Sequence, residues 1–254
     1  MSETAAAHVS ESPGADAAAP RTGAGVPVIG FDLDMTLVDS SAGIATTLQA
    51  VLAEVGVTVT AADTWPYAGL PLDVILTGLA PAIASTELAT LVARYRQLYP
   101  VLGVASVRSF PAAAAALAAP GAHGGRSVVV SAKHTPNVHR VLAVTGLGGA
   151  VADGDVAGDL FAEQKGARLA AFGATAYVGD HPGDVRAARV AGAVAVGVST
   201  GSHDVAALLE AGADVVLASL EQFPGWLEGH AARLRDGSAP AEPGKVERTA
   251  PEPR

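Results

Sequence analysis

The segment VPVIGFDLDMTL, residues 26–37, decides the fold class of this chain. Residues 26–33 form a short apolar run rich in β-formers, which is typical of a buried parallel strand. Asp32 and Asp34 lie where that run ends. Ligands of open α/β sheets bind beyond the carboxyl ends of the strands. Two like charges so close together need a cation or a shared proton, although an acidic turn without function is the alternative interpretation of the pair alone.

Four more apolar runs follow at intervals that leave room for helices. The clearest helix signal has Pro182 in its first turn and Gly192 just past its end, which is the usual asymmetry of helix ends. Strands that alternate with helices predict a parallel α/β sheet. The expected strands are 26–33, 127–131, 174–179, 193–198 and 214–217, and the expected helices are 111–119, 182–190 and 204–210.

Between the first two strands, residues 41–104 are too many for a simple crossover connection. Apolar residues recur at helical spacing at both ends of this stretch, so we expect a small helical domain inserted into the sheet domain. The sequence GLPL at 69–72 interrupts it. Trp65 and Tyr67 precede that sequence and are candidates to face the site, with the interior of the insert as the alternative place for two large aromatic rings.

Composition excludes several classes of function. The chain has 254 residues and a net charge of −9 without a basic run, which argues against nucleic acid or a membrane surface as a partner. It contains no cysteine, so thiolate metal sites and cysteine nucleophiles are excluded, and a cytoplasmic location is expected. No window approaches the roughly 20 apolar residues that span a bilayer. Residues 1–25 and 231–254 are expected to be mostly disordered tails.

Further polar residues occur at or near the ends of the later expected strands. Ser131 ends the second expected strand, and Lys133 follows it. Lys165 lies in EQKGARL, and the sequence GDHPGD places Asp180 and Asp184 after another expected strand. Each residue alone has an ordinary explanation, such as a solvated lysine or an acid favoured by a helix dipole. Their joint occurrence at strand ends indicates a site.

This order of motifs resembles the haloacid dehalogenase-like superfamily, whose signature is DxDxT, a serine or threonine after a strand, a lysine, and GDxxxD. The resemblance covers residues 26–227. GLPL at 69–72 and SAKHTPNV at 131–138 are similar to the branch of phosphoglycolate phosphatases and β-phosphoglucomutases. The resemblance implies a Rossmann-like three-layer α/β core with a parallel sheet at 26–40 and 105–230, and a small α-helical cap at 41–104.

The resemblance also implies a role for each motif residue. Asp32 would attack phosphorus and form an aspartyl-phosphate. Asp34 would protonate the leaving oxygen and later deprotonate the attacking water. Ser131 would hydrogen-bond a phosphate oxygen, and Lys165 would neutralise charge on Asp32 and on the transferred group. The true dehalogenases of the superfamily lack an acid at the position of Asp34, so its presence favours phosphate esters.

Mg²⁺ is the implied cofactor, because it is a hard cation that prefers oxygen ligands. The implied metal-binding residues are Asp32, Asp34 through its backbone carbonyl, Asp180 and Asp184. The expected substrate-binding residues are Thr36, Ser131, Ala132, Lys133, Trp65 and Tyr67. Ala132 departs from the asparagine of many relatives, and His181 stands where a serine is common.

The expected function is therefore a Mg²⁺-dependent phosphatase of a small phosphorylated metabolite, either a phosphoglycolate-like compound or a sugar phosphate. A phosphomutase of the same branch is the nearest alternative, but it needs cations in the cap, where Arg94 and Arg96 are the only basic residues. A catalytically silent domain on the same scaffold is a third hypothesis, and hydrolysis of pyrophosphate or nucleotides is a fourth. The sequence predicts no oligomeric state.

Overall fold

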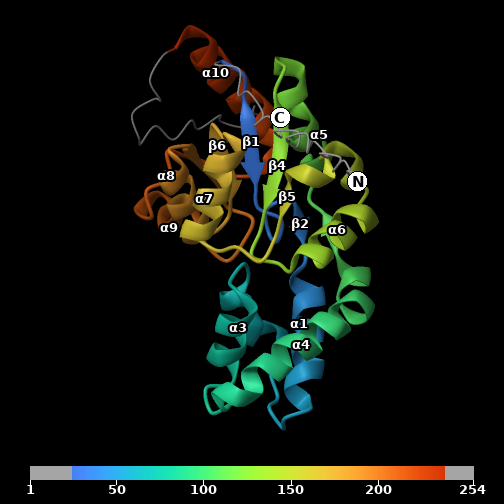
Figure 1. Cartoon of the computed structure of the whole chain (residues 1–254). Helices are drawn as coiled ribbons and strands as arrows, with labels where there is room; N and C mark the ends of the chain where they lie inside the picture. The colour runs from blue at the N-terminus through green and yellow to red at the C-terminus, as the bar shows by residue number, and fades with distance from the viewer. Residues whose placement is uncertain (1–24, 238–254) are drawn as a thin grey trace, which may run out of the picture.

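A six-stranded parallel sheet of order β5-β4-β1-β6-β7-β8 forms the centre of the molecule (Figure 1). The structure is a computed structural model that describes residues 25–237. It confirms the expected Rossmann-like α/β fold and adds β5, which is too short to leave a pattern in the sequence. The strands are β1 (Val28–Phe31), β4 (Arg126–Val130), β5 (Val156–Ala157), β6 (Ala176–Gly179), β7 (Val194–Val198) and β8 (Val215–Leu217).

Helices cover both faces of this sheet, which gives three layers. Successive residues of β1 face opposite sides: Val28 packs with Leu169 in one apolar cluster, and Phe31 packs with Phe223 in the other. Gly30 carries no side chain because Leu169 occupies the space where a Cβ would stand. One face is covered by α7 (Glu163–Phe172), α8 (Pro182–Ala191) and α9 (Val205–Glu210), and the other by α5 (Ala113–Ala118), α6 (Thr135–Val144) and α10 (Phe223–Asp236).

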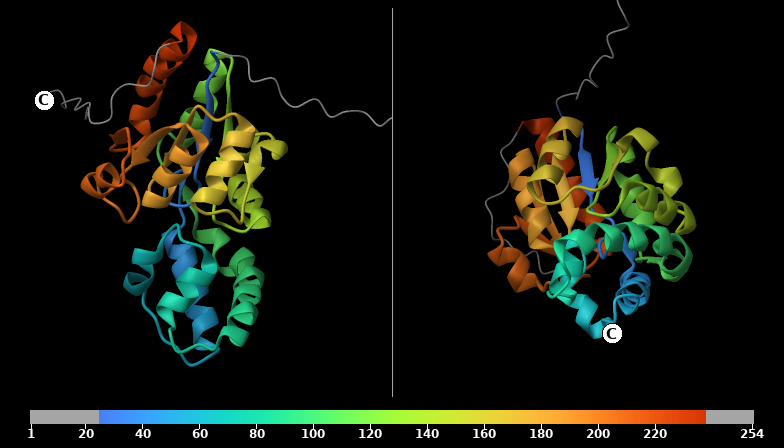
Figure 2. Two further views of the ribbon diagram at one scale, coloured as in Figure 1. Left: turned by 60° about the vertical axis from the view of Figure 1, so that its left-hand side comes forward. Right: turned by 60° about the horizontal axis from the view of Figure 1, so that its bottom comes forward.

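A helical unit, which we call the cap, lies beyond one end of the sheet (Figures 1 and 2). The chain enters it through β2 (Val38–Asp39) and leaves it through β3 (Arg108–Ser109), and these two strands pair antiparallel. A Cβ on Gly43 would overlap the carbonyl of Gly103, so the two ends of the cap are in close contact beside this pair. The cap helices are α1 (Ser41–Ala53), α2 (Ala61–Thr64), α3 (Leu72–Leu79) and α4 (Ser85–Leu102).

Helix α10 continues to Asp236, six residues beyond the boundary that the sequence analysis places at residue 230. Phe223, Leu227 and Ala231 are buried on one side of it at a spacing of four residues, which is helical periodicity that the composition of the end of the chain obscures. Residues 1–24 and 238–254, where tails are expected, lie outside the described residues. Within 25–237, no helix combines the length and apolar composition needed to cross a bilayer.

His230 on α10 gives stability a specific dependence on pH. Its Nε2 lies 3.0 Å from Thr175 Oγ1, and its ring stacks on Trp226. Burial, with a smaller contribution from Arg233, lowers the pKa of His230 from 6.5 to about 4. The unfolded chain therefore binds this proton more tightly than the folded protein does. The stabilisation from neutral His230 is fully present above pH 6.5 and is lost as the pH falls towards 4.

We expect the difference in unfolding free energy between the wild type and His230→Gln to fall by about 3 kcal/mol from neutral pH to pH 4. Urea denaturation of both proteins across this range measures it. Using the variant as the reference removes the contributions of the other titrating groups, which the two proteins share. A difference that does not change with pH would contradict the burial of a neutral imidazole.

Candidate active site

The loop after β1 sets the position of the acidic pair. The strand itself ends at Phe31, although the Asp32 N–H still donates to Val178 O at 2.9 Å and extends the pairing with β6. Met35 has a φ of 60°, which is left-handed backbone that a non-glycine residue seldom adopts. Its carbonyl accepts a hydrogen bond from Thr200 Oγ1 at 2.6 Å. This turn brings the acidic pair to the carboxyl edge of the sheet.

Three buried carboxylates meet at that edge. Asp32, Asp180 and Asp184 each offer an oxygen within 4.8 Å of the others. All three residues are buried, with exposed fractions of 1%, 0% and 4%. Asp32 Oδ1 and Asp180 Oδ2 accept no hydrogen bond from the described residues. Buried carboxylate oxygens without donors are costly, so these two oxygens indicate a place for a cation.

Lys165 is the cation that the chain itself supplies to this cluster. It comes from the first turn of α7, is 1% exposed, and its Nζ lies 2.7 Å from Asp184 Oδ1 and 3.1 Å from Asp32 Oδ1. The contact with Asp32 is an ion pair without hydrogen-bond geometry, which is why that oxygen still lacks a donor. Burial lowers the pKa of Lys165, but Asp184 and Asp32 outweigh it, and the net direction is upward. The lysine therefore stays charged.

One ammonium does not balance three carboxylates. Burial raises the pKa of Asp32 to about 7, against the lowering effect of Lys165, with Asp184 and Asp34 adding to the rise. Burial, followed by Asp184 and Asp32, also raises the pKa of Asp180 well above its ordinary value. When all three carboxylates are ionised, two negative charges remain uncompensated. The charge and the oxygen donors fit a divalent cation.

Glycines make room for these carboxylates. A Cβ on Gly201 would overlap the Asp180 carboxylate, and a Cβ on Gly179 would overlap that of Asp184. Thr36 is fully buried, and its Oγ1 donates to Asp180 Oδ1 at 2.8 Å. Thr36, which the sequence assigns to substrate, therefore contacts and orients a carboxylate of the cluster. Gly201 was not identified from the sequence, because only the fold brings it against Asp180.

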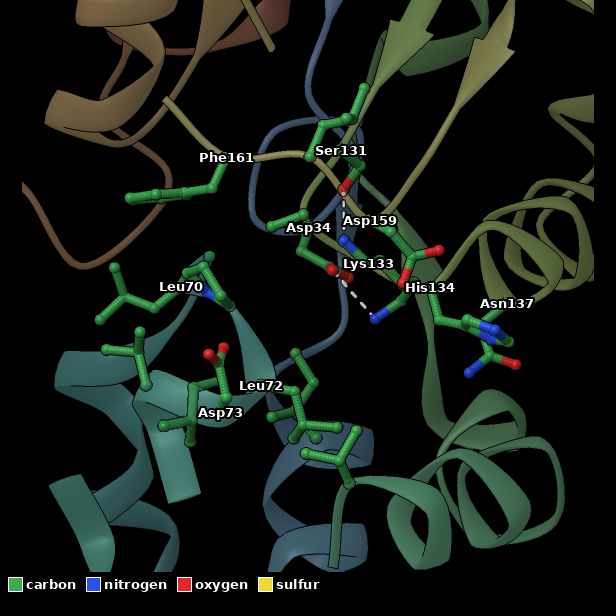
Figure 3. Close-up of a pocket in the computed structure, with 18 of the residues that line it drawn as sticks. Asp34, Leu70, Leu72, Asp73, Ser131, Lys133, His134, Asn137, Asp159 and Phe161 are labelled. Atoms are coloured by element: carbon green, nitrogen blue, oxygen red, sulfur yellow. Dashed lines mark hydrogen bonds and ion pairs between the residues drawn. The ribbon is translucent and has the colours of Figure 1, made fainter. Parts of the chain in front are cut away.

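Asp34 has a different environment from the cluster. Its Oδ2 lies 2.9 Å from Lys133 Nζ (Figure 3). Its Oδ1 accepts a hydrogen bond from Ser40 Oγ at 2.6 Å. The Lys133 ammonium also lies 4.3 Å from the centre of the Tyr99 ring, which belongs to the cap helix α4. Burial lowers the pKa of Lys133, but Asp34 and the two tyrosines Tyr99 and Tyr95 reverse this, and the net direction is upward.

A cavity of about 670 Å³ separates the core from the cap, and the carboxylates of Asp32 and Asp34 form part of its wall (Figure 3). Ser131, Ala132 and Lys133, which the sequence assigns to substrate, line it on the core side. On the cap side, the GLPL segment and the first turn of α3 line it. The space is of the size that small-molecule sites commonly have.

Trp65 and Tyr67, which the sequence assigns to substrate, are not among the residues that line this cavity. Trp65 is 40% exposed and borders a separate pocket of about 220 Å³ within the cap. The Tyr67 ring packs against Gly78 of α3. The aromatic ring that the cap does place in the cavity wall is Tyr95, on α4.

His181 has a structural position at the start of α8. Its Nδ1 accepts a hydrogen bond from the Gly183 N–H at 2.9 Å, and its own N–H donates to Asp184 Oδ2 at 3.2 Å. Burial lowers the pKa of His181 to about 4, although Asp184 opposes this. The neutral ring caps the helix and thereby helps to fix the Asp184 carboxylate.

Comparison with known proteins agrees with this geometry. The family model for haloacid dehalogenase-like hydrolases matches residues 29–189, and a second, HAD-hydrolase-like model matches residues 158–223. The chain belongs to the haloacid dehalogenase-like hydrolase family. No curated protein sequence matches the chain.

Solved structures with low sequence identity share the fold. A predicted phosphatase from Clostridium acetobutylicum is 20% identical, with a TM-score of 0.72 over 80% of this chain and 99% of that one. A predicted phosphoglycolate phosphatase from Haemophilus somnus is 22% identical, with a TM-score of 0.68 over 80% and 98%. A hydrolase of the same family from Deinococcus radiodurans, with bound phosphate and sodium, is 23% identical, with a TM-score of 0.60 over 86% and 100%.

The imbalance of charge in the cluster predicts opposite effects for two substitutions in metal-free protein. Asp180→Asn removes a repelling charge, so its melting temperature in EDTA should exceed that of the wild type. Lys165→Met leaves the buried carboxylates uncompensated and should cost about 3–5 kcal/mol of unfolding free energy. Added Mg²⁺ should stabilise the wild type and fail to stabilise Asp180→Asn. Equal melting temperatures of Asp180→Asn and wild type in EDTA would contradict the uncompensated charge.

Proposed function

We propose that this chain is a Mg²⁺-dependent phosphatase that hydrolyses the phosphomonoester of a small metabolite. The observation that carries the proposal is the pair of carboxylates that share one cavity in different environments. Asp32 lies with the carboxylate cluster beside Lys165, and Asp34 lies apart from it between Lys133 and Ser40. Titratable groups in contrasting environments are the usual arrangement of a nucleophile and an acid–base.

Asp32 acts as the nucleophile in this proposal. The attack of Asp32 on phosphorus forms an aspartyl-phosphate and expels the alcohol, and water then releases phosphate and regenerates the carboxylate. Asp34 gives its proton to the leaving oxygen in the first step and takes a proton from water in the second. Lys133 and Ser40 hold the Asp34 carboxylate against the cavity while the proton moves.

Asp32, Asp180 and Asp184, with the backbone carbonyl of Asp34, would hold Mg²⁺, which would supply the positive charge that lets a carboxylate approach a phosphate. Lys165 contributes to the same neutralisation from the protein side, and the Ser131 hydroxyl stands in the cavity wall to donate to a phosphate oxygen. Positioning and charge neutralisation account for most of the catalysis of phosphoryl transfer. The bound phosphate in the Deinococcus radiodurans relative supports this class of ligand.

Transfer to a second phosphorylated substrate is less compatible with the cap. A mutase has to bind two phosphate groups, and the only basic residues of the cap already have acidic partners. Arg94 pairs with Glu54 at 2.9 Å, and Arg96 pairs with Asp159 at 2.7 Å. Water is therefore the acceptor that this cavity supports.

Asp32→Asn should abolish Mg²⁺-dependent release of phosphate from a panel of small phosphomonoesters, because no covalent intermediate can form. Asp34→Asn should lower kcat by about 10²–10⁴-fold, because the leaving oxygen loses its proton donor. Released phosphate is measured with and without Mg²⁺. Glu87→Gln, which removes an exposed carboxylate of the cap that does not line the cavity, is the matched control.

Activity that survives in Asp32→Asn would contradict the proposal. If the folded wild type binds Mg²⁺ but releases no phosphate, the same panel should be tested for isomerisation of sugar phosphates, which is the mutase outcome. A protein that neither binds Mg²⁺ nor turns over any ester would be a silent domain.

A further inference from the structure

The cations in the cavity wall are already neutralised by the protein. Lys133 pairs with Asp34 at 2.9 Å, and Arg96 pairs with Asp159 at 2.7 Å. Asp159 is held in place because its Oδ2 also accepts the Thr135 N–H at 3.0 Å. His134 is the remaining basic residue of the wall, and burial lowers its pKa. The part of the cavity that receives the leaving group therefore offers no uncompensated positive charge from the described residues.

The cap does place a carboxylate in this space. Asp73 lies in the first turn of α3, and Figure 3 shows its carboxylate directed into the cavity from the cap side, facing the core side that carries Asp34. Among residues 25–237, no lysine, arginine or histidine forms an ion pair with it. The negative charge of Asp73 is consequently directed towards whatever occupies the cavity.

The surroundings of Asp73 are apolar. Leu70 and Leu72 lie on either side of it on the cap, and Phe161, from the core loop before α7, lines the same cavity (Figure 3). A leaving group in this space would contact aliphatic and aromatic side chains, and Asp73 is the carboxylate that the cap offers it. An anionic end would instead meet the Asp73 carboxylate without a counter-ion, and juxtaposed like charges disfavour binding.

We propose that the substrate is the phosphomonoester of a small alcohol that has an apolar body and an N–H or O–H donor, and that carries no anion besides its phosphate. Asp73 is the residue that selects it, by accepting the donor and repelling carboxylates. The inference rests on the proposed phosphatase activity. Of the two substrate classes expected from the sequence, it disfavours the phosphoglycolate-like acid, whose carboxylate Asp73 would repel.

A matched series of substrates tests this directly. Ethyl phosphate substituted at its second carbon with an ammonium, a hydroxyl, a methyl or a carboxylate group varies only the end that would face Asp73. For the wild type with Mg²⁺, kcat/KM should be highest for the ammonium and hydroxyl esters, lower for the methyl ester and lowest for the carboxylate. Comparison of the ammonium ester with the hydroxyl ester shows whether the preferred donor is an N–H or an O–H group.

Asp73→Asn removes the charge and keeps the size of the side chain. We expect it to reduce the ratio of kcat/KM for the ammonium ester to that for the carboxylate ester about tenfold, a moderate factor because Asp73 is exposed to solvent. The change should appear in KM for the ammonium and carboxylate esters. Glu87→Gln, which removes a cap charge outside the cavity, should leave the ratio unchanged, and melting temperatures check that both variants are folded.

The results distinguish a failure of the role of Asp73 from a failure of the proposed phosphatase activity. Hydrolysis of all four esters at similar rates, or an unchanged ratio in Asp73→Asn, overturns the role of Asp73 and leaves the phosphatase standing. A wild type that prefers the carboxylate ester overturns the inference as well. No Mg²⁺-dependent hydrolysis of any ester, the methyl ester included, overturns both.

Discussion

The structure depends on the burial of three carboxylates around a single ammonium group. Asp32, Asp180 and Asp184 each bring a carboxylate oxygen within 4.8 Å of the others beside Lys165, and burial, together with the neighbouring carboxylates, raises the pKa of Asp32 and of Asp180. Such a cluster is costly for folding. In the proposed function this cost has a purpose: the uncompensated negative charge would attract a divalent cation, and the cation would in turn attract a phosphate.

The parallel sheet makes this arrangement possible. Strands β1, β4 and β6 end at the same edge, so Asp32, Ser131 and Asp180, which are far apart in the sequence, meet there. The cap then closes the site from the other side. Its α4 carries Tyr99 to Lys133 and Arg96 to Asp159, and these two contacts join the cap to the core. In our proposals the core supplies the catalytic groups and the cap selects the substrate.

The sheet and the charged residues at its edge could be predicted because both are local patterns. A buried strand is recognised as a run of apolar residues. The residues that follow the run are then expected at the carboxyl edge of the sheet without knowledge of the packing. The errors lie where the answer depends on packing. Trp65 and Tyr67 stand beside the GLPL segment but do not line the cavity, and Thr36 contacts Asp180. The contact between Lys133 and Tyr99 depends on how α4 packs on the core, and the spacing of residues in the sequence does not predict that packing.

The most direct test of the account is to find the covalent intermediate. An aryl phosphate has a leaving group that needs no proton, so Asp34→Asn can complete the first step but lacks the base for the second. Acid quenching followed by peptide mass spectrometry of that variant should find one phosphoryl group on Asp32, formed only with Mg²⁺ and absent from Asp32→Asn. A phosphoryl group on another residue, or the phenol and phosphate released together with no labelled peptide, would contradict Asp32 as the nucleophile.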